Sequence, residues 1–381
     1  MYRRLLAEPN FKETVMNAIK IPVYRPSLRG NERQYVNECL DSTWISSKGR
    51  FVNDFECAFS EKVGAEHSVS VCNGTVALHL ALLALGIGPT DEVIVPTLTY
   101  IASVNAITYT GATPVFVDVD PVTWQMDPED VLRHITPRTR ALMVVHLYGQ
   151  CCNMSALMGT ARDNNLFVIE DCAEAFGSRF KGKHVGTFGD LAAFSFFGNK
   201  TITTGEGGMV VTNDKTLALR ARHFRGQGLA DHREYWHDVV GYNYRMTNVA
   251  AAIGLAQLEC SDEIIARKRA IADRYKIGLA GLPIEIHSEI PETTHSYWMI
   301  SILVSSPSLR DSLRLHLADD GVETRPVFFP VHTMPMYAKA FRRHPVAESI
   351  AWRGINLPSW PDLTEADIST VVDSIRKFFR L

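Results

Sequence analysis

A lysine and an aspartate are the residues whose type and placement best fit catalysis in this sequence. Lys200 lies in the stretch FSFFGNKTITTGEGG (194–208), after an apolar run and a Gly-Asn turn. A lysine at the end of a buried strand sits in a low-dielectric pocket, which lowers the pKa of its amine and activates it to form a Schiff base. Taken alone, the pattern also fits a solvated lysine beside a tight glycine-rich loop.

Asp171 ends a second apolar run, LFVIED (166–171), 29 residues before Lys200. Open α/β sheets place ligand-binding groups at the carboxyl ends of their strands. A carboxylate there can pair with the protonated ring nitrogen of pyridoxal phosphate (PLP) and keep the ring an effective electron sink. The alternative for Asp171 alone is a helix N-cap. An acid and a lysine that end two strands of one sheet are together what a PLP site requires.

Two further features complete such a site. Gly74 and Thr75 stand directly ahead of the helical run VALHLALLALG, where backbone N–H groups and a hydroxyl form a seat for phosphate. Ser195 offers a second hydroxyl to the phosphate. Tyr100 follows the strand-end sequence PTLT and can stack on the pyridine ring. Each motif is weak alone, since Thr75 also fits a simple cap and Tyr100 simple packing, but their order along one sheet edge predicts PLP.

The elements that must position these residues alternate between about residues 70 and 215. Short β-rich apolar runs, typical of strands buried on both faces, are separated by helical patterns, which indicates βαβ units and a mostly parallel sheet. A long helical pattern after Tyr244 then leads into a mixed C-terminal segment, and we expect a domain boundary near 255–265. The expected strands are 92–96, 113–117, 141–146, 166–170, 191–197 and 209–212, and the expected helices include 76–85, 101–109, 128–135 and 155–164.

Composition excludes several classes of function. The chain has 381 residues, 46% of them hydrophobic, and a formal net charge of −3 with scattered lysines and arginines, so we expect no nucleic-acid partner. No apolar run approaches the roughly 20 residues that span a bilayer, and the first residues lack the apolar core of a secretory signal. The seven cysteines form no CxxC pair, which predicts reduced thiols in the cytoplasm and no metal site.

The sequence resembles the DegT-type sugar aminotransferases from about Ile21 to the C-terminus. The resemblance implies the type I, aspartate-aminotransferase-like PLP fold, with an N-terminal extension (1–20), a large PLP-binding domain (21–258) and a small α+β domain (259–381). It rests on WISSKG (44–49), NGTVALHLAL (73–82), PTLTYIAS (96–103), HLYGQ (146–150), EDCAEAFGS (170–178), SFFGNKTITTGEGGMV (195–210), GYNYRMTNVAAAIG (241–254) and TRPVFFPVHTMPMY (324–337).

The resemblance also implies roles for residues at matching positions. Lys200 would carry the cofactor and act as general base and acid, and Asp171 would pair with its ring nitrogen. Glu174 would reach the 3-hydroxyl side of the ring, although many family members have Gln or His there. Asn243 would contact the phosphate from the neighbouring subunit of a homodimer with shared active sites. The phosphate seat would be Gly74, Thr75 and Ser195, with Tyr100 over the ring.

Within that family, FFGNKTITTGEGG, RMTNVAAAIG and HTMPMY are most similar to enzymes that aminate C4 of GDP-4-keto-6-deoxymannose with L-glutamate as donor. Arg245 and Arg325 are candidates for the donor carboxylates because arginine binds them in bidentate fashion, although either also fits a structural ion pair. His332 is a candidate for the sugar or its diphosphate, or a satisfied loop histidine. Ser47 and Tyr148, in matched segments, are further substrate candidates.

Three alternatives stay open at this point. The first is an aminotransferase for another nucleotide keto-sugar, linked to dTDP or UDP, because substrate contacts in this family come from variable loops. The second is a 3-dehydratase of the same family, which characteristically has histidine in place of the lysine; Lys200 opposes it. The third is a non-catalytic PLP-binding regulator, which the absence of an appended DNA-binding segment opposes.

Overall fold

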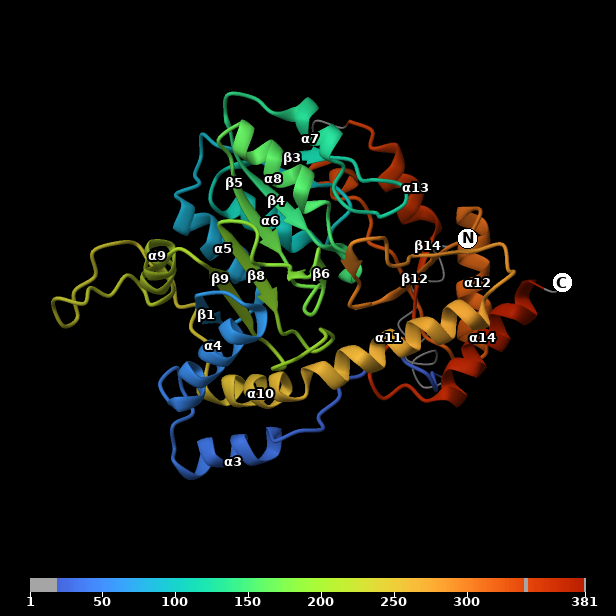
Figure 1. Cartoon of the computed structure of the whole chain (residues 1–381), viewed down its shortest axis with the longest axis horizontal. Coiled ribbons are helices and arrows are strands. Elements are labelled where there is room, and N and C mark those ends of the chain that lie inside the picture. The colour runs from blue at the N-terminus through green and yellow to red at the C-terminus, as the bar shows by residue number, and fades with distance from the viewer. Residues whose placement is uncertain (1–18, 339–341, 380–381) are drawn as a thin grey trace.

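The computed structural model describes residues 19–338 and 342–379. Its centre is a seven-stranded sheet in the order β1-β9-β8-β5-β4-β2-β3 (Figure 1). Strands β2, β3, β4, β5 and β8 run parallel, whereas β9 is antiparallel to both of its neighbours. The mostly parallel sheet that the sequence predicts is therefore confirmed. The strands are β1 (His67–Val71), β2 (Glu92–Pro96), β3 (Thr113–Val117), β4 (Thr139–Val145), β5 (Phe167–Asp171), β8 (Leu191–Ser195) and β9 (Gly208–Thr212).

Helices cover both faces of this sheet, which is why its central strands are continuous apolar runs such as EVIVP in β2. One core lies between the sheet and helices α5 (Gly74–Leu85), α6 (Ile101–Tyr109) and α9 (Lys215–Arg225). A second core lies on the other face. Its helices are α3 (Glu32–Asp41), α4 (Arg50–Val63), α7 (Pro128–His134), α8 (Met154–Asp163) and α10 (Asn248–Glu259).

A smaller antiparallel sheet in the order β10-β12-β14-β13 forms a separate C-terminal layer. Helix α11 (Ser261–Gly278) follows α10 directly and leads from the large sheet to this layer (Figure 1). Ile21 pairs with Val322 there, although the sequence analysis counts it with the large domain, and the exact domain limits stay a prediction. Its elements are β10 (Glu285–Ile286), β12 (Ile300–Leu303), β13 (Arg325–Pro326), β14 (Gly354–Leu357), α12 (Pro307–Asp319), α13 (Pro345–Arg353) and α14 (Glu365–Phe379).

Shorter pieces join the two layers. A three-stranded sheet pairs β11 with β6 and β6 with β7, which connects the segment before β12 to the loop that follows β5. Two single 3₁₀ turns, η1 (Leu147–Gly149) and η2 (Val331–Thr333), lie at the same junction. The three strands are β6 (Arg179–Phe180), β7 (Lys183–His184) and β11 (Thr293–Thr294).

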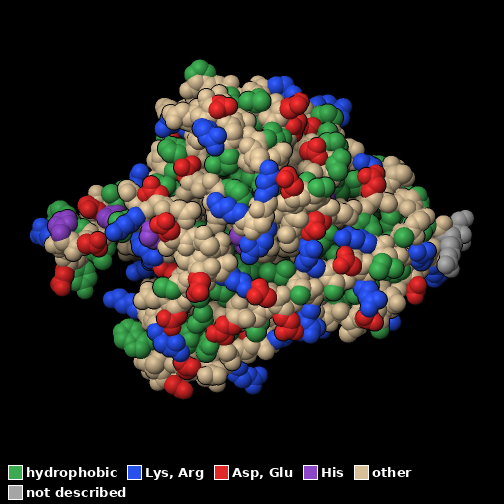
Figure 2. Space-filling view, in the orientation of Figure 1, with side chains coloured by type: hydrophobic (Ala, Val, Ile, Leu, Met, Phe, Trp, Pro, Cys, Tyr) green, Lys and Arg blue, Asp and Glu red, His purple; other side chains and the backbone are tan. Residues whose placement is uncertain are grey.

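The segment between α9 and α10 leaves the body of the molecule as an extended arm, which we define as residues 227–240 (Figure 1). Its ends are held by backbone pairing of Gly226 with Asn243 and of Leu229 with His237. The arm carries exposed apolar side chains, and Tyr235 is 93% exposed. On the face shown in Figure 2, acidic and basic side chains are interspersed. Among the helices in the described ranges, none is long and apolar enough to cross a membrane.

Candidate active site

Lys200 lies in the connection between β8 and the antiparallel strand β9. The connection is held by hydrogen bonds from the Phe196 N–H to the Gly207 carbonyl (2.8 Å) and from the Thr204 N–H to the Phe196 carbonyl (2.9 Å). Gly205 has φ +80°, a conformation that side chains rarely adopt, so glycine is needed for this turn. The side chain of Lys200 is 12% exposed, and burial lowers the pKa of its amine.

Glu174 is the anionic partner of this lysine. Its Oε1 lies 3.8 Å from Lys200 Nζ, and its Oε2 accepts a hydrogen bond from the Tyr148 backbone N–H at 2.9 Å. Burial raises the pKa of Glu174 to about 7, because loss of hydration outweighs the attraction of the lysine. Burial therefore moves the pKa values of the amine and the carboxyl toward each other.

Asp171 ends β5 with its carboxylate facing α6. The Ser103 hydroxyl donates to Oδ2 at 2.7 Å, and the Ala173 N–H donates to Oδ1 at 3.1 Å. Both donors are neutral, and burial raises the pKa of Asp171. A ligand that brings a cationic N–H to this carboxylate would compensate for the burial of its charge, as the protonated pyridine nitrogen of PLP does.

The start of α5 meets the end of β8, as a phosphate seat requires. The Asn73 side chain caps α5 by accepting from the Val76 N–H at 3.0 Å. A Cβ added at Gly74 would lie 2.6 Å from the Ser195 Cβ, so only glycine lets the helix start come this close to the strand. The predicted phosphate residues Gly74, Thr75 and Ser195 therefore gather where a helix N-terminus favours an anion.

Tyr100 stands at the N-terminus of α6 with 56% of its surface exposed. Its ring lies 5.5 Å from the ring of Phe328, between centroids. Each of these features matches one part of PLP. The exposed Tyr100 ring can cover the pyridine ring, and the N-terminus of α5 can bind the phosphate. Asp171 can pair with the ring nitrogen, and the Lys200 amine can react with the aldehyde. The residues present thus fit this cofactor.

The family model described as the DegT/DnrJ/EryC1/StrS aminotransferase family matches residues 26–376. This chain belongs to that family. It is 63% identical, over 94% of its length and 98% of the relative, to the GDP-perosamine synthase of Escherichia coli O157:H7. It is 50% identical to the GDP-perosamine synthase of Vibrio cholerae, over 94% and 99% of the two chains. The PLP form of the putative sugar aminotransferase Spr1654 from Streptococcus pneumoniae superposes with a TM-score of 0.90 at 28% identity, over 94% and 98%.

Membership confirms the predictions of an aminotransferase, of the type I fold and of PLP as its cofactor. It leaves the roles of single residues to be tested. For the cofactor set, the structure brings Lys200, Glu174 and Asp171 together at one end of the parallel strands and Gly74 beside Ser195.

The residues predicted to bind substrate lie in two different environments of this aminotransferase. Arg245 is exposed and donates to the Asn243 side-chain oxygen at 3.0 and 3.2 Å. Arg325, also exposed, lies 3.5 Å from a Glu323 carboxylate oxygen, and Ser47 is half-buried in the segment before α4. These residues stay candidates for substrate contact. The structure brings Arg245 and Asn243 together and leaves Arg325 and Ser47 on other segments.

Tyr148 and His332 are buried at the junction of the two layers. The Tyr148 side chain is fully buried, and its hydroxyl accepts from the Phe328 N–H at 2.9 Å. His332 is 2% exposed, and its Nδ1 lies 2.7 Å from the Thr97 hydroxyl. Within this chain, the contacts of both residues are with protein groups that join the layers, and their roles toward a sugar remain predictions.

Three contacts of the site were missed from the sequence. Ser103 orients Asp171, and its only signal was its place one helical turn after the strand-end motif PTLT. The Tyr24 hydroxyl donates to the Lys200 carbonyl, and the Trp298 indole N–H donates to the Asn199 carbonyl at 2.7 Å. These last two come from segments about 176 and 99 residues away along the chain, which no local pattern connects to Lys200.

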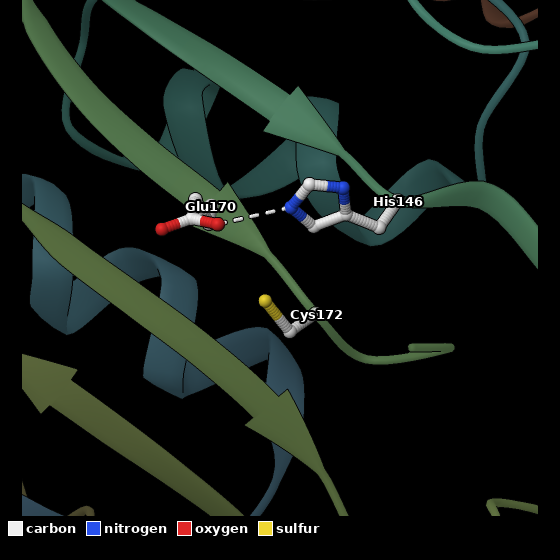
Figure 3. A group of neighbouring side chains, drawn as sticks. All are labelled: His146, Glu170 and Cys172. Carbon is white, nitrogen blue, oxygen red and sulfur yellow. Dashed lines mark hydrogen bonds and ion pairs between the residues drawn. The ribbon is translucent and has the colours of Figure 1, made fainter. Parts of the chain in front are cut away.

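His146, Glu170 and Cys172 form a buried cluster that includes the two sequence neighbours of Asp171 (Figure 3). The Cys152 N–H donates to His146 Nδ1, so the ring proton is on Nε2, which donates to Glu170 at 3.0 Å. Glu170 also accepts three backbone N–H groups, from Gly186, Phe188 and Gly189. Its lone pairs are thus engaged by protein donors, and the cluster fixes the loop after β5 rather than offering a metal site.

Proposed function

We propose that this enzyme transfers the amino group of L-glutamate to C4 of GDP-4-keto-6-deoxy-D-mannose and forms GDP-perosamine. The observation that carries the choice of substrate is the 63% identity, over nearly the whole chain, to a relative named GDP-perosamine synthase. The chemistry is supported by a buried amine, a buried carboxylate and a helix N-terminus at one edge of the sheet. An aminotransferase for a dTDP- or UDP-linked keto-sugar is the second candidate, because the loops around the site are the variable part of the family.

Lys200 moves the protons in this proposal. Bound PLP supplies an electron sink for the carbon that loses a proton. The Lys200 amine removes the proton from the α-carbon of glutamate, and in the second half of the reaction it delivers a proton to form the C–H bond at C4 of the sugar. Burial lowers the pKa of this amine, which increases the fraction that is free to act as a base near neutral pH.

Asp171 and Glu174 determine where protons are held in the proposed site. Asp171, oriented by Ser103, holds the proton on the ring nitrogen. Glu174, with a pKa raised to about 7, accepts or returns a proton beside Lys200 and avoids leaving an isolated buried charge.

The second part of the proposal is a homodimer in which Asn243 of one subunit reaches the phosphate site of the other. It is supported by the exposure of Asn243 and Arg245, which pair with each other at the base of the arm. The exposed apolar side chains of the arm, including Tyr235 and Val240, also favour contact with another protein surface. A two-fold dimer would bury two such arms and complete two sites.

The experiment that tests the substrate is a panel of GDP-, dTDP- and UDP-linked keto-sugars, each offered with L-glutamate to the purified holoenzyme. Formation of 2-oxoglutarate and of the amino-sugar, identified by mass, is measured for each. We expect turnover of the GDP-4-keto-6-deoxy-sugar to exceed that of the others by about 100-fold or more, as a nucleotide-specific pocket provides. A preference for a dTDP- or UDP-sugar would replace the substrate and leave the aminotransferase chemistry intact.

A further inference from the structure

Trp298 contacts the Lys200 segment in two ways. Lys200 Nζ lies 4.0 Å from the centroid of the Trp298 ring. On the edge of the same indole, Nε1–H donates to the carbonyl of Asn199, the residue immediately before the lysine, at 2.7 Å. The tryptophan is 3% exposed, although it belongs to the C-terminal half of the chain. One side chain therefore holds both the amine and the backbone that carries it.

The position of this ring is fixed by the junction of the two layers. The ring stacks on Tyr148, with 5.9 Å between centroids and 11° between planes. Its backbone passes so close to Gly149 that a Cβ added there would be 3.0 Å from the Trp298 nitrogen and 2.6 Å from the Ser296 hydroxyl oxygen. The Ser178 hydroxyl also lies 2.9 Å from that of Ser296. The indole has little freedom to turn away from Lys200.

The chemical consequence follows from the electrostatics of the ring. The face of tryptophan is electron-rich and attracts an ammonium group, most strongly where water is excluded. Lys200 has lost most of its hydration, and among the described residues the acids that act on its amine are Glu174, 3.8 Å away, and Asp171 at longer range. The amine thus lies between a carboxylate and an aromatic face. Each time Lys200 takes up a proton, the ring stabilises the resulting cation.

We propose that Trp298 is a positioning residue for the proton transfers at Lys200: its face stabilises the ammonium form of the lysine, and its N–H fixes the turn that aims the amine. The C-terminal layer thereby contributes to a step whose acid and base groups, Lys200 and Glu174, lie in loops that follow strands of the large sheet. The proposal rests on the role given above to Lys200. It does not depend on which keto-sugar is the substrate.

The test measures the pH dependence with which the Lys200 amine is modified. The full-length protein is freed of cofactor with hydroxylamine and treated with cyanate over a range of pH, and mass spectrometry of the Lys200 peptide gives the labelling rate. Because only the neutral amine reacts, the midpoint of the rate profile reports the pKa of Lys200. We expect Trp298→Leu to lower this midpoint by about one pH unit and Trp298→Phe to lower it by less, since phenylalanine retains a weaker aromatic face.

The matched control is Trp360→Phe, a buried tryptophan in the core of the C-terminal layer. It should leave the midpoint unchanged, which separates the ring face from a general loosening of that layer. Near-ultraviolet circular dichroism checks that each variant is folded, and Trp298→Phe keeps the test available if the leucine variant does not fold. An unchanged or raised midpoint in the folded Trp298 variants overturns the proposal.

A separate measurement keeps this outcome distinct from failure of the proposed function. Borohydride reduction of the wild-type holoenzyme should fix the cofactor to Lys200, as peptide mapping will show. Attachment elsewhere overturns the function assigned to Lys200 and, with it, the relevance of Trp298 to catalysis. Attachment at Lys200 combined with an unchanged labelling midpoint in Trp298→Leu overturns the positioning role alone.

Discussion

The floor of the cofactor site, formed by Asp171, Glu174 and Lys200, and the extended arm differ in how far their side chains are buried. At the floor, Asp171 and Glu174 are buried and the Lys200 side chain is 12% exposed, and each contacts groups of the same chain. At the arm, Tyr235 and Val240 are 93% and 87% exposed, and Asn243 contacts Gly226 and Arg245 at the arm's base. The comparison teaches that groups of one chain orient the buried carboxylates and the amine, whereas the arm leaves apolar side chains exposed that the proposed dimer would cover.

Burial explains the difference in physical terms. Charged groups at the floor have lost hydration, so their protonation depends on a few fixed partners at distances below about 4 Å. Apolar side chains of the arm remain in water and gain stability only when another surface covers them. Changes at the floor should therefore act on rate, and changes at the arm should act through association.

The largest loss of turnover is expected from a substitution at the floor of the cofactor site. Lys200→Ala removes the group that carries the cofactor and moves the protons, so turnover should fall by at least about 10⁴-fold. The phosphate seat and Asp171 remain, and the variant should still bind PLP or the amino-sugar product without a covalent link. Formation of 2-oxoglutarate and the visible spectrum measure both effects. Full activity would refute the role of Lys200.

The next prediction tests whether Asn243, at the base of the arm, serves the active site of the other subunit. Lys200→Ala and Asn243→Glu should each be inactive alone, but their heterodimer should have one intact site and recover up to about half of the wild-type activity per dimer. Subunits are mixed, allowed to exchange and assayed, after sizing has shown that both variants assemble. If heterodimers form and stay inactive, Asn243 serves its own subunit. A fully active monomer in sedimentation would also contradict the shared site.

A smaller effect is expected from Asp171→Asn. The amide keeps the shape but no longer holds the proton on the ring nitrogen, and turnover should fall by about 100-fold. The free energy of unfolding should change by less than about 1.5 kcal/mol, because burial raises the pKa of Asp171 and the fold gains little from its charge. Assays and urea unfolding are compared on the same preparations. Near-wild-type turnover with an intact cofactor spectrum would contradict the assignment.

The last prediction concerns the acid response of a buried histidine outside both regions, with the arm as its control. Burial lowers the pKa of His287 to about 4, whereas an unfolded histidine titrates near 6.5. The folded state prefers the neutral ring, so its contribution is complete above pH 6.5 and is lost progressively as the pH falls toward 4, by about 3 kcal/mol at most.

Urea unfolding at pH 7.5 and pH 5 measures this loss. His287→Gln retains a donor toward the Thr123 carbonyl, which His287 Nε2 contacts at 2.8 Å, and should show a smaller difference between the two pH values. Tyr235→Ser, in the arm, is the matched control and should respond to pH as the wild type does. An equal response in all three proteins would mean that other groups govern the acid sensitivity.

The sequence predicted the parts of the site that depend on strand ends and helix starts. Lys200, Asp171 and Gly74 were found because a buried strand or a glycine-started helix fixes where a side chain must lie. Trp298 was not found, because SYWMISILV reads as an apolar strand and its contact depends on how two layers pack. Tyr148 was expected to contact substrate; its ring stacks on Trp298 and Phe328, a contact between layers that the sequence does not reveal, and its role toward substrate stays a prediction.

The pairing of distant segments also has a consequence for how the protein is made. Ile21 pairs with Val322. The Val23 N–H donates to the carboxylate of Glu323, which lies 300 residues later in the chain. Strand β1 likewise cannot pair until its partner β9 has been synthesised. At a synthesis rate of about 5 to 20 residues per second, the first segment stays unpaired for roughly 15 to 60 s. All strands of the large sheet, which ends with β9 at Thr212, are therefore made before the partner of the Ile21–Val23 segment.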